Sequence, residues 1–349
     1  MLVKDFDYPL PDELIAQKPV TPRDSSKLLV LNRKDGTVNH RKFTDLPEFF
    51  DKGDLLVLND TKVYPARLFG EKVDGGAKVE LLLLKTTGND IWEALARPGK
   101  RLKTGTVISF GTDIMRADVL ADTDDGGKIV KLYAGKNDNG DLVIDLIHRL
   151  GELPLPPYIT DGPKKDERDV YQTVYAKIEG SSAAPTAGLH FTNEIFDALE
   201  KKGIETSYVT LHIGLGTFRP MQTERCEDHI MHYESYSVSA KTVEMIERVK
   251  KRGNKVVSIG TTTARTLESI ALINNGKVVA CSGDTNLYIR PGFKFGVVDA
   301  LVTNFHQPKS TLLLLVSAFA EKDFIFKAYH EAIKERYRFL SFGDSMLIL

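Results

Sequence analysis

Apolar and polar residues alternate with a short period between residues 62 and 149. Asp-Gly-Gly turns at 74–76 and 125–127 separate runs of strand length, a spacing typical of an antiparallel sheet or small barrel. The runs lie at 79–84, 91–95, 107–110 and 128–133. This part of the chain is therefore predicted to be a small antiparallel β-barrel-like domain.

From about residue 159 onward, strand-like runs alternate with amphipathic helices. Residues 240–252 place Val243, Ile246 and Val249 on one helical face, and Gly253 ends the pattern. Such alternation is typical of a layered α/β fold.

Strand-like runs at 28–31 and 55–58 also precede the barrel-like segment. The predicted layout is thus an α/β main domain, residues 1–61 and 150–349, interrupted by the inserted domain, residues 62–149. The longest apolar stretch, 311–320, is about half the length that a membrane-spanning helix needs and predicts a buried helix instead.

Composition narrows the class of protein. The 349 residues carry 47 Lys and Arg against 48 Asp and Glu, so a nucleic-acid partner would have to meet a local basic patch. Two cysteines, Cys226 and Cys281, are too few for a disulfide scaffold, and the first residues lack an export signal. We expect a cytoplasmic protein without a membrane partner, most simply a monomer.

Several common chemistries lack their motifs. The chain has no phosphate-binding P-loop and no His-Glu-x-x-His zinc motif, and residues 214–219 place Arg219 where a dinucleotide fingerprint has its third glycine. Cys226, His229 and His232 have a Cys-x-x-His-x-x-His spacing, but no second ligand pair accompanies them. A metal site there stays a minor alternative, and no metal is expected.

Four segments of the α/β part are rich in small residues, Thr and His. Each lies where a strand or a loop meets a helix, and they span residues 183–192, 210–218, 256–268 and 301–310. In α/β folds such junctions bind ligands. The first precedes a predicted helix at 193–202, for which Thr192 is the expected cap. A turn followed by a routine capped helix is the competing interpretation.

The other three segments add candidate chemistry. A strand runs into a glycine-bearing loop after His212, although a satisfied histidine in a flexible turn is the alternative there. Free N–H groups and three hydroxyls at 261–263 suit an anionic group, whereas an N-cap needs only one threonine. Asn304 and His306 complete the set and predict one shared cleft.

The four segments and several others together resemble the S-adenosylmethionine:tRNA ribosyltransferase-isomerase family of queuosine biosynthesis. The matching stretches are LNDT at 58–61, PARL at 65–68, YQTVY at 171–175, APTAGLHFT at 184–192, TLHIGLGTFRP at 210–220, GTTTARTLES at 260–269, TNFH at 303–306 and FLSFGD at 339–344. The resemblance extends over essentially the whole chain. One departure is Gln307, where the family pattern has Leu.

The resemblance implies a two-domain protein with an inserted β domain, in agreement with the patterning. It also implies that the ribosyl portion of S-adenosylmethionine is transferred to the aminomethyl group of a 7-deazaguanine at the tRNA wobble position. The product would be epoxyqueuosine, with adenine and methionine released. S-adenosylmethionine would be a consumed cosubstrate, and no cofactor is expected.

For that chemistry, we expect general acid-base roles for some of the three histidines His190, His212 and His306, and the sequence leaves open which of them is the base. The expected S-adenosylmethionine-binding residues are Thr186, Gly188, Gly214, Gly216, Thr261, Thr262, Thr263, Arg265 and Asn304. Asp60 and Asp344 are candidate acceptors for the donors of the deazaguanine, with a turn or cap role as the alternative. A basic turn formed by Arg97, Lys100, Arg101 and Lys103 is the candidate tRNA contact, with a solvated turn as the alternative.

Two other function classes make different predictions. A conventional methyltransferase would release S-adenosylhomocysteine, but the glycine-rich strand end typical of that class is missing. A noncatalytic tRNA-binding protein would turn over no small molecule, yet the His and Thr segments are intact.

Overall fold

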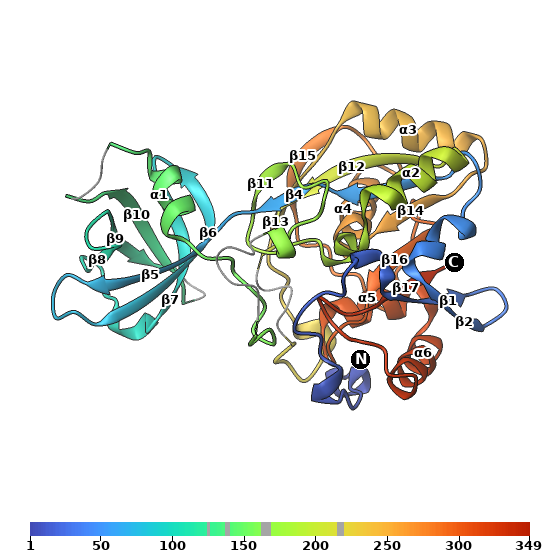
Figure 1. Cartoon of the computed structure of the whole chain (residues 1–349), viewed down its shortest axis with the longest axis horizontal. Helices are drawn as coiled ribbons and strands as arrows, with labels where there is room; N and C mark the ends of the chain where they lie inside the picture. Colours follow the sequence, from blue (N-terminus) through green and yellow to red (C-terminus); the bar gives the residue numbers. More distant parts are fainter. Residues whose placement is uncertain (124–125, 137–139, 162–168, 215–219) are drawn as a thin grey trace.

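The computed structural model describes residues 1–123, 126–136, 140–161, 169–214 and 220–349. It contains a larger α/β part and a smaller β-barrel, which lie side by side in Figure 1. The predicted fold class, an α/β main domain with an inserted barrel, is confirmed.

The larger part is built on a nine-stranded sheet with the order β15-β13-β12-β3-β14-β16-β17-β1-β2. In that order the strands are β15 (Cys281–Thr285), β13 (Glu234–Val238), β12 (Glu205–Leu211), β3 (Leu55–Asn59), β14 (Val256–Ile259), β16 (Ala300–Asn304), β17 (Ser345–Ile348), β1 (Lys27–Asn32) and β2 (Thr37–Lys42). The four central strands β12, β3, β14 and β16 are parallel neighbours. Their carboxyl ends therefore meet along one edge of the sheet, where α/β folds bind ligands.

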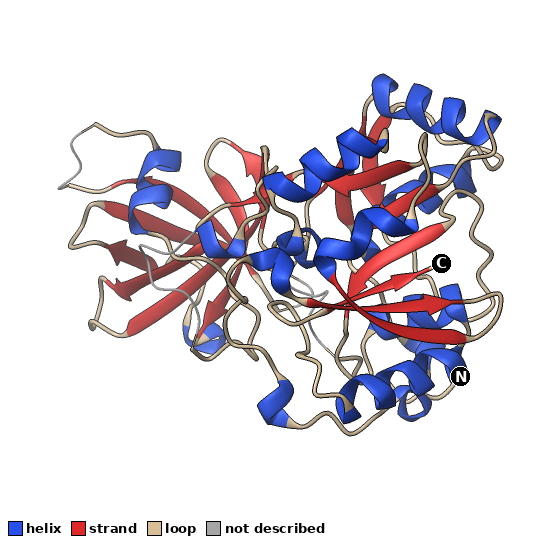
Figure 2. Cartoon of the chain, turned by 45° about the vertical axis from the view of Figure 1, so that its right-hand side comes forward, coloured by secondary structure: helices blue, strands red, loops and turns tan. Residues whose placement is uncertain are grey.

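Helices cover both faces of this sheet (Figure 2). One face is packed by α3 (Ala240–Lys251), α4 (Thr261–Ile273), α5 (Thr311–Ala320) and α6 (Lys322–Lys334), the other by α2 (Asn193–Lys202) and the 3-10 helix η4 (Phe43–Phe49). Along β3, Leu55 and Val57 enter the first core and Leu56 and Leu58 the second. The strand is apolar throughout because successive side chains point to opposite faces and both faces are buried.

The smaller part is a closed antiparallel barrel with the order β10-β7-β6-β5-β8-β9. Its strands are β5 (Arg67–Lys72), β6 (Lys78–Gly88), β7 (Ile91–Arg97), β8 (Val107–Phe110), β9 (Met115–Asp122) and β10 (Lys128–Ala134). Leu146 and Ile147 of α1 (Val143–Leu150) pack into its core. The barrel and its helix span residues 67–150, close to the segment 62–149 that the hydrophobic pattern predicts as the inserted domain.

The parallel pair β4 (Thr61–Val63) and β11 (Ile178–Ser181) lies beside the connection between the two parts. There His148 Nε2 of α1 lies 3.0 Å from Glu179 Oε2 of β11. Three predicted helices are found with the expected bounds or within one residue of them, namely α2, α3 and α5. Across the described part of the chain, every helix is too short or too polar to cross a bilayer.

Candidate active site

The carboxyl ends of the parallel strands border two small pockets of about 30 Å³ each, which share lining residues and are together called the main cleft below. It is lined by Tyr158, residues 184–187, Ile213, residues 260–262, residues 303–307, Ser310, Leu312, Leu340 and Ser341. The loops after β12, β14 and β16 and the short helix η7 (Thr186–His190) all contribute to it. The structure thus brings Thr186, Asn304 and His306 together with the start of α4, as the sequence predicts.

Asn59, the last residue of β3, fixes this edge of the sheet. Its amide nitrogen donates to the Leu211 carbonyl at 3.0 Å and lies 3.3 Å from the Thr262 hydroxyl. Its amide oxygen accepts from the Leu211 N–H at 3.0 Å. The ends of β3 and β12 are therefore tied to the first turn of α4.

The first turn of α4 follows Gly260, which has a φ of +88° and provides no side-chain cap. Thr261 and Thr262 line the main cleft. The Thr263 hydroxyl instead donates to the Ile259 carbonyl at 2.9 Å. Two of the three predicted threonines, together with the N-terminal end of a helix dipole, therefore face the space where an anion would be stabilised.

His306 lies on the loop after β16 and lines the main cleft. Its Nε2 is 2.9 Å from the Thr303 hydroxyl, and its backbone N–H donates to the Tyr329 hydroxyl at 3.0 Å. Among the described residues, Nδ1 has no hydrogen-bond partner. Burial lowers its pKa to about 3, so the imidazole is neutral with one free nitrogen.

His190 stands behind the cleft, 4% exposed and stacked on Phe43. Its Nδ1 is 2.8 Å from the Ser26 hydroxyl and its Nε2 is 3.2 Å from the Asn304 amide nitrogen. Burial, with smaller contributions from Arg338 and Arg23, lowers its pKa to about 3. Both ring nitrogens are engaged, which leaves none to exchange a proton with a substrate.

These two histidines predict that the protein loses stability in mild acid. The unfolded chain takes up protons below pH 6.5, whereas the folded imidazoles stay neutral down to about pH 3. Between pH 7.5 and 5.0 the free energy of unfolding should fall by about 2 kcal/mol for each histidine. Urea unfolding at both pH values measures this, and His190→Gln should remove about half of the drop. Equal stability at the two pH values would contradict it.

His212, the third predicted histidine, directly follows β12. It is not among the residues that line the main cleft and lies instead beside Thr61 and Asp60. Its Nδ1 is 2.8 Å from the Thr61 hydroxyl, and burial lowers its pKa while nearby Asp60 opposes the shift. Asp60 accepts from the Thr210 hydroxyl at 2.6 Å, and burial raises its pKa. His212 Nε2 has no partner among the described residues, so this histidine keeps one nitrogen for proton transfer.

A second pocket, called the arginine pocket below, lies next to the main cleft. It is lined by Gly214, His229, Met231, His232, Glu234, Arg265 and Thr311. The Arg265 Nη1 forms a buried ion pair with Glu234, and its Nε donates to the Leu287 carbonyl at 3.2 Å. Glu234 also accepts from the Gly214 N–H at 3.0 Å. Arg265 Nη2 has no partner within the described residues.

Three further predicted residues are placed as follows. Gly188 is packed so closely that a Cβ would lie 1.9 Å from the Tyr175 hydroxyl, which explains the glycine by packing. The carboxylate of Asp344 accepts from the backbone N–H groups of Lys27 and Arg338, both at 2.8 Å, so it holds a turn. Gly216 lies outside the described residues.

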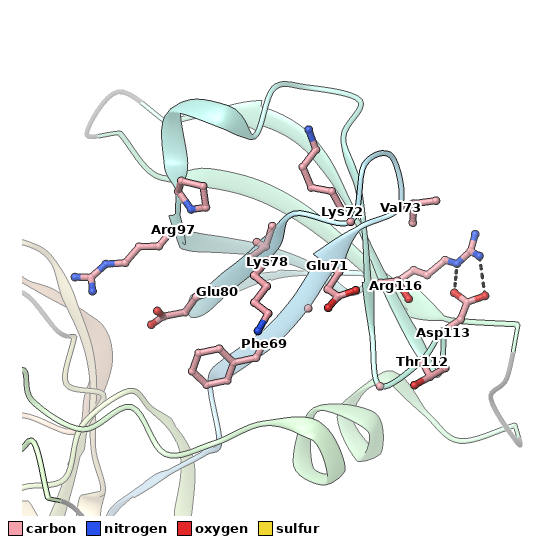
Figure 3. A pocket seen from close by; sticks show the side chains of 16 residues that line it. Phe69, Glu71, Lys72, Val73, Lys78, Glu80, Arg97, Thr112, Asp113 and Arg116 are labelled. Carbon is pink, nitrogen blue, oxygen red and sulfur yellow. Dashed lines mark hydrogen bonds and ion pairs between the residues drawn. The ribbon is translucent and has the colours of Figure 1, made fainter.

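The predicted basic turn lies on the barrel. Arg97, Lys100, Arg101 and Lys103 are all exposed around the short helix η5 (Gly99–Arg101), and Leu102 between them is buried in the barrel core. Arg97 borders a pocket of about 1240 Å³ on the barrel, which Lys72, Lys78 and half-exposed Phe69 also line (Figure 3). In the described part of the chain, none of the four cations has an acidic partner.

Cys226, His229 and His232, which have a metal-like spacing in the sequence, take different positions in the structure. Cys226 is buried in the short helix η9 (Cys226–Asp228), and His229 and His232 line the arginine pocket. No group of three or more His, Cys, Asp or Glu within the described ranges is arranged to hold a metal ion.

Comparison with known proteins now assigns the family. A family model described as queuosine biosynthesis protein matches residues 3–348, and the chain belongs to that family. The chain is also similar to the crystal structure of an S-adenosylmethionine tRNA ribosyltransferase from Thermotoga maritima. The two share 41% sequence identity over 99% of this chain and 100% of that one, with a TM-score of 0.57. The resemblance derived from the motifs is confirmed.

Proposed function

We propose that the protein transfers and isomerises the ribosyl moiety of S-adenosylmethionine. The acceptor is the aminomethyl group of 7-aminomethyl-7-deazaguanine at the wobble position of tRNA. The products are epoxyqueuosine-tRNA, adenine and methionine, so S-adenosylmethionine is a consumed cosubstrate. Family membership over nearly the whole chain supports this function, and the main cleft at the carboxyl edge of the sheet is where we place the reaction.

His306 is the first candidate for proton transfer at the cleft. The sulfonium acidifies the neighbouring C5′ hydrogens of the cosubstrate. In the tautomer in which Nε2–H donates to the Thr303 hydroxyl, the Nδ1 of His306 is unprotonated and can accept one of these protons. Burial keeps the His306 imidazole neutral, which is the form that can accept a proton, and it also makes this imidazole a weaker base than an exposed histidine. His212 is the second candidate, because its Nε2 is also free in the described structure.

The start of α4 is the candidate site for the methionine carboxylate. Thr261 and Thr262 offer hydroxyls and a helix N-terminus at the cleft. Arg265 is neutralised by Glu234, so it offers one spare Nη2 donor rather than a full positive charge.

The basic turn is the candidate tRNA contact, and it leads to a prediction. Reversing Lys100 and Arg101 to Glu should weaken tRNA binding about tenfold or more, because phosphate contacts are lost. The slope of log affinity against log salt should fall by about 1–2. Filter binding at several salt concentrations measures both, with the double variant Lys241→Glu and Lys251→Glu on α3 as the surface control of equal charge change. If the Lys100 and Arg101 variant binds tRNA like the control, the basic turn is not part of the contact.

Mass spectrometry after incubation with S-adenosylmethionine and the modified tRNA tests the function itself. Release of adenine and methionine in step with a pentose-derived mass gain on the tRNA is the expected result. S-adenosylhomocysteine would instead assign methyl transfer. Intact tRNA binding without turnover would assign a noncatalytic binding protein.

A further inference from the structure

The cavity of about 1240 Å³ on the barrel is far larger than the pockets of the main cleft, and it is called the barrel groove below. Residues of β5, β6, β8 and β9 and of the turns between strands line it (Figure 3). Pockets that bind a small organic ligand typically measure about 300–1,000 Å³. The barrel groove is therefore large enough for a nucleotide.

Phe69 presents an aromatic ring in this groove. Successive side chains of β5 point to opposite faces of the barrel wall, so Leu68 enters the core while Phe69 stays outside, 49% exposed. The Arg67 guanidinium lies over the Phe69 ring, 5.0 Å from its centroid. Arg67 is itself held by Glu80, whose Oε1 accepts from the Arg67 Nε at 2.8 Å. The ring is thus supported by a fixed side chain, and half of its surface remains open to a ligand.

The charges that line the groove leave an excess of positive charge. Two of its acids are already neutralised, because Arg67 binds Glu80 and the Arg116 Nη2 donates to the Asp113 Oδ2 at 2.7 Å. A third acid, Glu71, has no ion-pair partner among the described residues. Three lining cations also have none there, and they are Lys72, Lys78 and Arg97. Three unpaired cations against one unpaired acid suit an anionic ligand.

An exposed aromatic ring beside unpaired cations is typical of sites that bind unpaired nucleotides. The base stacks on the ring, and the neighbouring phosphates are attracted to the cations. A duplex cannot use such a ring, because its bases are stacked inside the helix and its phosphates face outward. Arg97 belongs both to the groove and to the basic turn, so the candidate tRNA contact extends to the groove. A tRNA has unpaired nucleotides in its loops and therefore fits this site.

We propose that the barrel groove binds an unpaired nucleotide of the tRNA, with its base stacked on Phe69 and its phosphates near Lys72, Lys78 and Arg97. The inference rests on the proposed function for the identity of the RNA. It adds to the basic turn, which offers only charge, a site that takes a base. Because Phe69 is uncharged, its contribution to binding should not depend on salt, whereas that of the cations should.

Filter binding of tRNA at several salt concentrations tests the two contributions separately. Phe69→Ala should weaken binding about fivefold to a hundredfold, with the slope of log affinity against log salt unchanged. Lys78→Ala should instead lower that slope by about 1. Leu120→Ala is the matched control, because Leu120 is an apolar residue of β9 that is 41% exposed and does not line the groove. It should bind tRNA like wild type, and urea unfolding verifies that all three variants are folded.

A fluorescent variant reports on stacking directly. Phe69→Trp should keep the tRNA affinity, because an indole also stacks on a base. Bound tRNA should quench the emission that this variant adds to that of Trp92, the single tryptophan of the wild type. A blunt RNA duplex at the same nucleotide concentration has no unpaired base and should leave the added emission unchanged.

Two results would overturn the inference while ribosyl transfer is intact. If Phe69→Ala binds tRNA as tightly as Leu120→Ala, no base stacks on this ring. If the duplex quenches the Phe69→Trp variant as strongly as tRNA does, the groove takes phosphates and not a base. Failure of the proposed function has a different signature, namely a wild type that binds tRNA in a Phe69-dependent way but releases no adenine. If the wild type binds no tRNA at all, the inference and the proposed function both fail.

Discussion

Replacing His306 by Gln should lower the rate of adenine release by about 10²- to 10⁴-fold, the range typical of a lost general acid-base group. His306 lines the main cleft, and its Nδ1 has no partner among the described residues. Gln is close in size and can keep the hydrogen bond to Thr303, but an amide cannot accept a proton at neutral pH. Single-turnover adenine release, followed by mass spectrometry, measures the effect.

Two controls separate chemistry from folding and binding. S-adenosylmethionine affinity, measured by calorimetry, should change less than about threefold in His306→Gln, because proton transfer contributes to the transition state rather than to ground-state binding. His190→Gln should keep turnover within about tenfold, since both nitrogens of that histidine already serve the protein. A His306→Gln variant that releases adenine nearly as fast as wild type would move the acid-base role to His212, whose Nε2 is also free.

The sequence predicts where the candidate residues gather better than it predicts what each side chain can do there. The glycine and threonine segments at strand ends locate the carboxyl edge correctly, because parallel strands force their carboxyl ends together. His190 and His306 look alike in sequence, since each lies in a segment where a strand or loop meets a predicted helix. Only the structure shows that one ring is fully hydrogen-bonded and the other keeps a free nitrogen.

Residues that act through long-range partners leave no local signal. Glu234 is the first residue of strand β13, and the residues around it in the sequence form no recognisable motif. Its role becomes visible only through its ion pair with Arg265, which lies 31 positions further along the chain. In the same way, the sequence around Asp344 does not show that its two carboxylate oxygens accept hydrogen bonds from the backbone N–H groups of Lys27 and Arg338.

Several of the elements that the patterning did not predict are short or irregular, although the missed helix α6 has 13 residues. Helix α1 has eight residues at the end of a β-rich segment, and its apolar side is recognisable only against the barrel core. Strands β5 and β9 mix charged residues with apolar ones, and β5 leaves Phe69 half exposed on the outside of the barrel. Whether such elements form depends more on their tertiary packing than on the local periodicity of the sequence.

The second large effect is expected at the ion pair of the arginine pocket. Glu234→Leu should lower the free energy of unfolding by about 3–5 kcal/mol, because it leaves the Arg265 guanidinium charged, buried and unpaired. The side chains of Arg265 and Glu234 are only 3% and 4% exposed, so water cannot replace the lost carboxylate. Urea unfolding at pH 7.5 measures the loss.

Comparison with other variants shows whether the loss comes from the uncompensated charge. Adding Arg265→Met to Glu234→Leu should recover a large part of the stability, because the pair is then replaced by apolar groups of similar size. Asp7→Ala breaks the exposed pair between Asp7 and Lys309 and should cost less than about 1 kcal/mol. If Glu234→Leu costs no more than Asp7→Ala, or if the double variant is no more stable than the single one, the guanidinium is not held by Glu234 in solution. The spare Nη2 would then belong to a mobile side chain, and the arginine pocket would not be preorganised for a substrate.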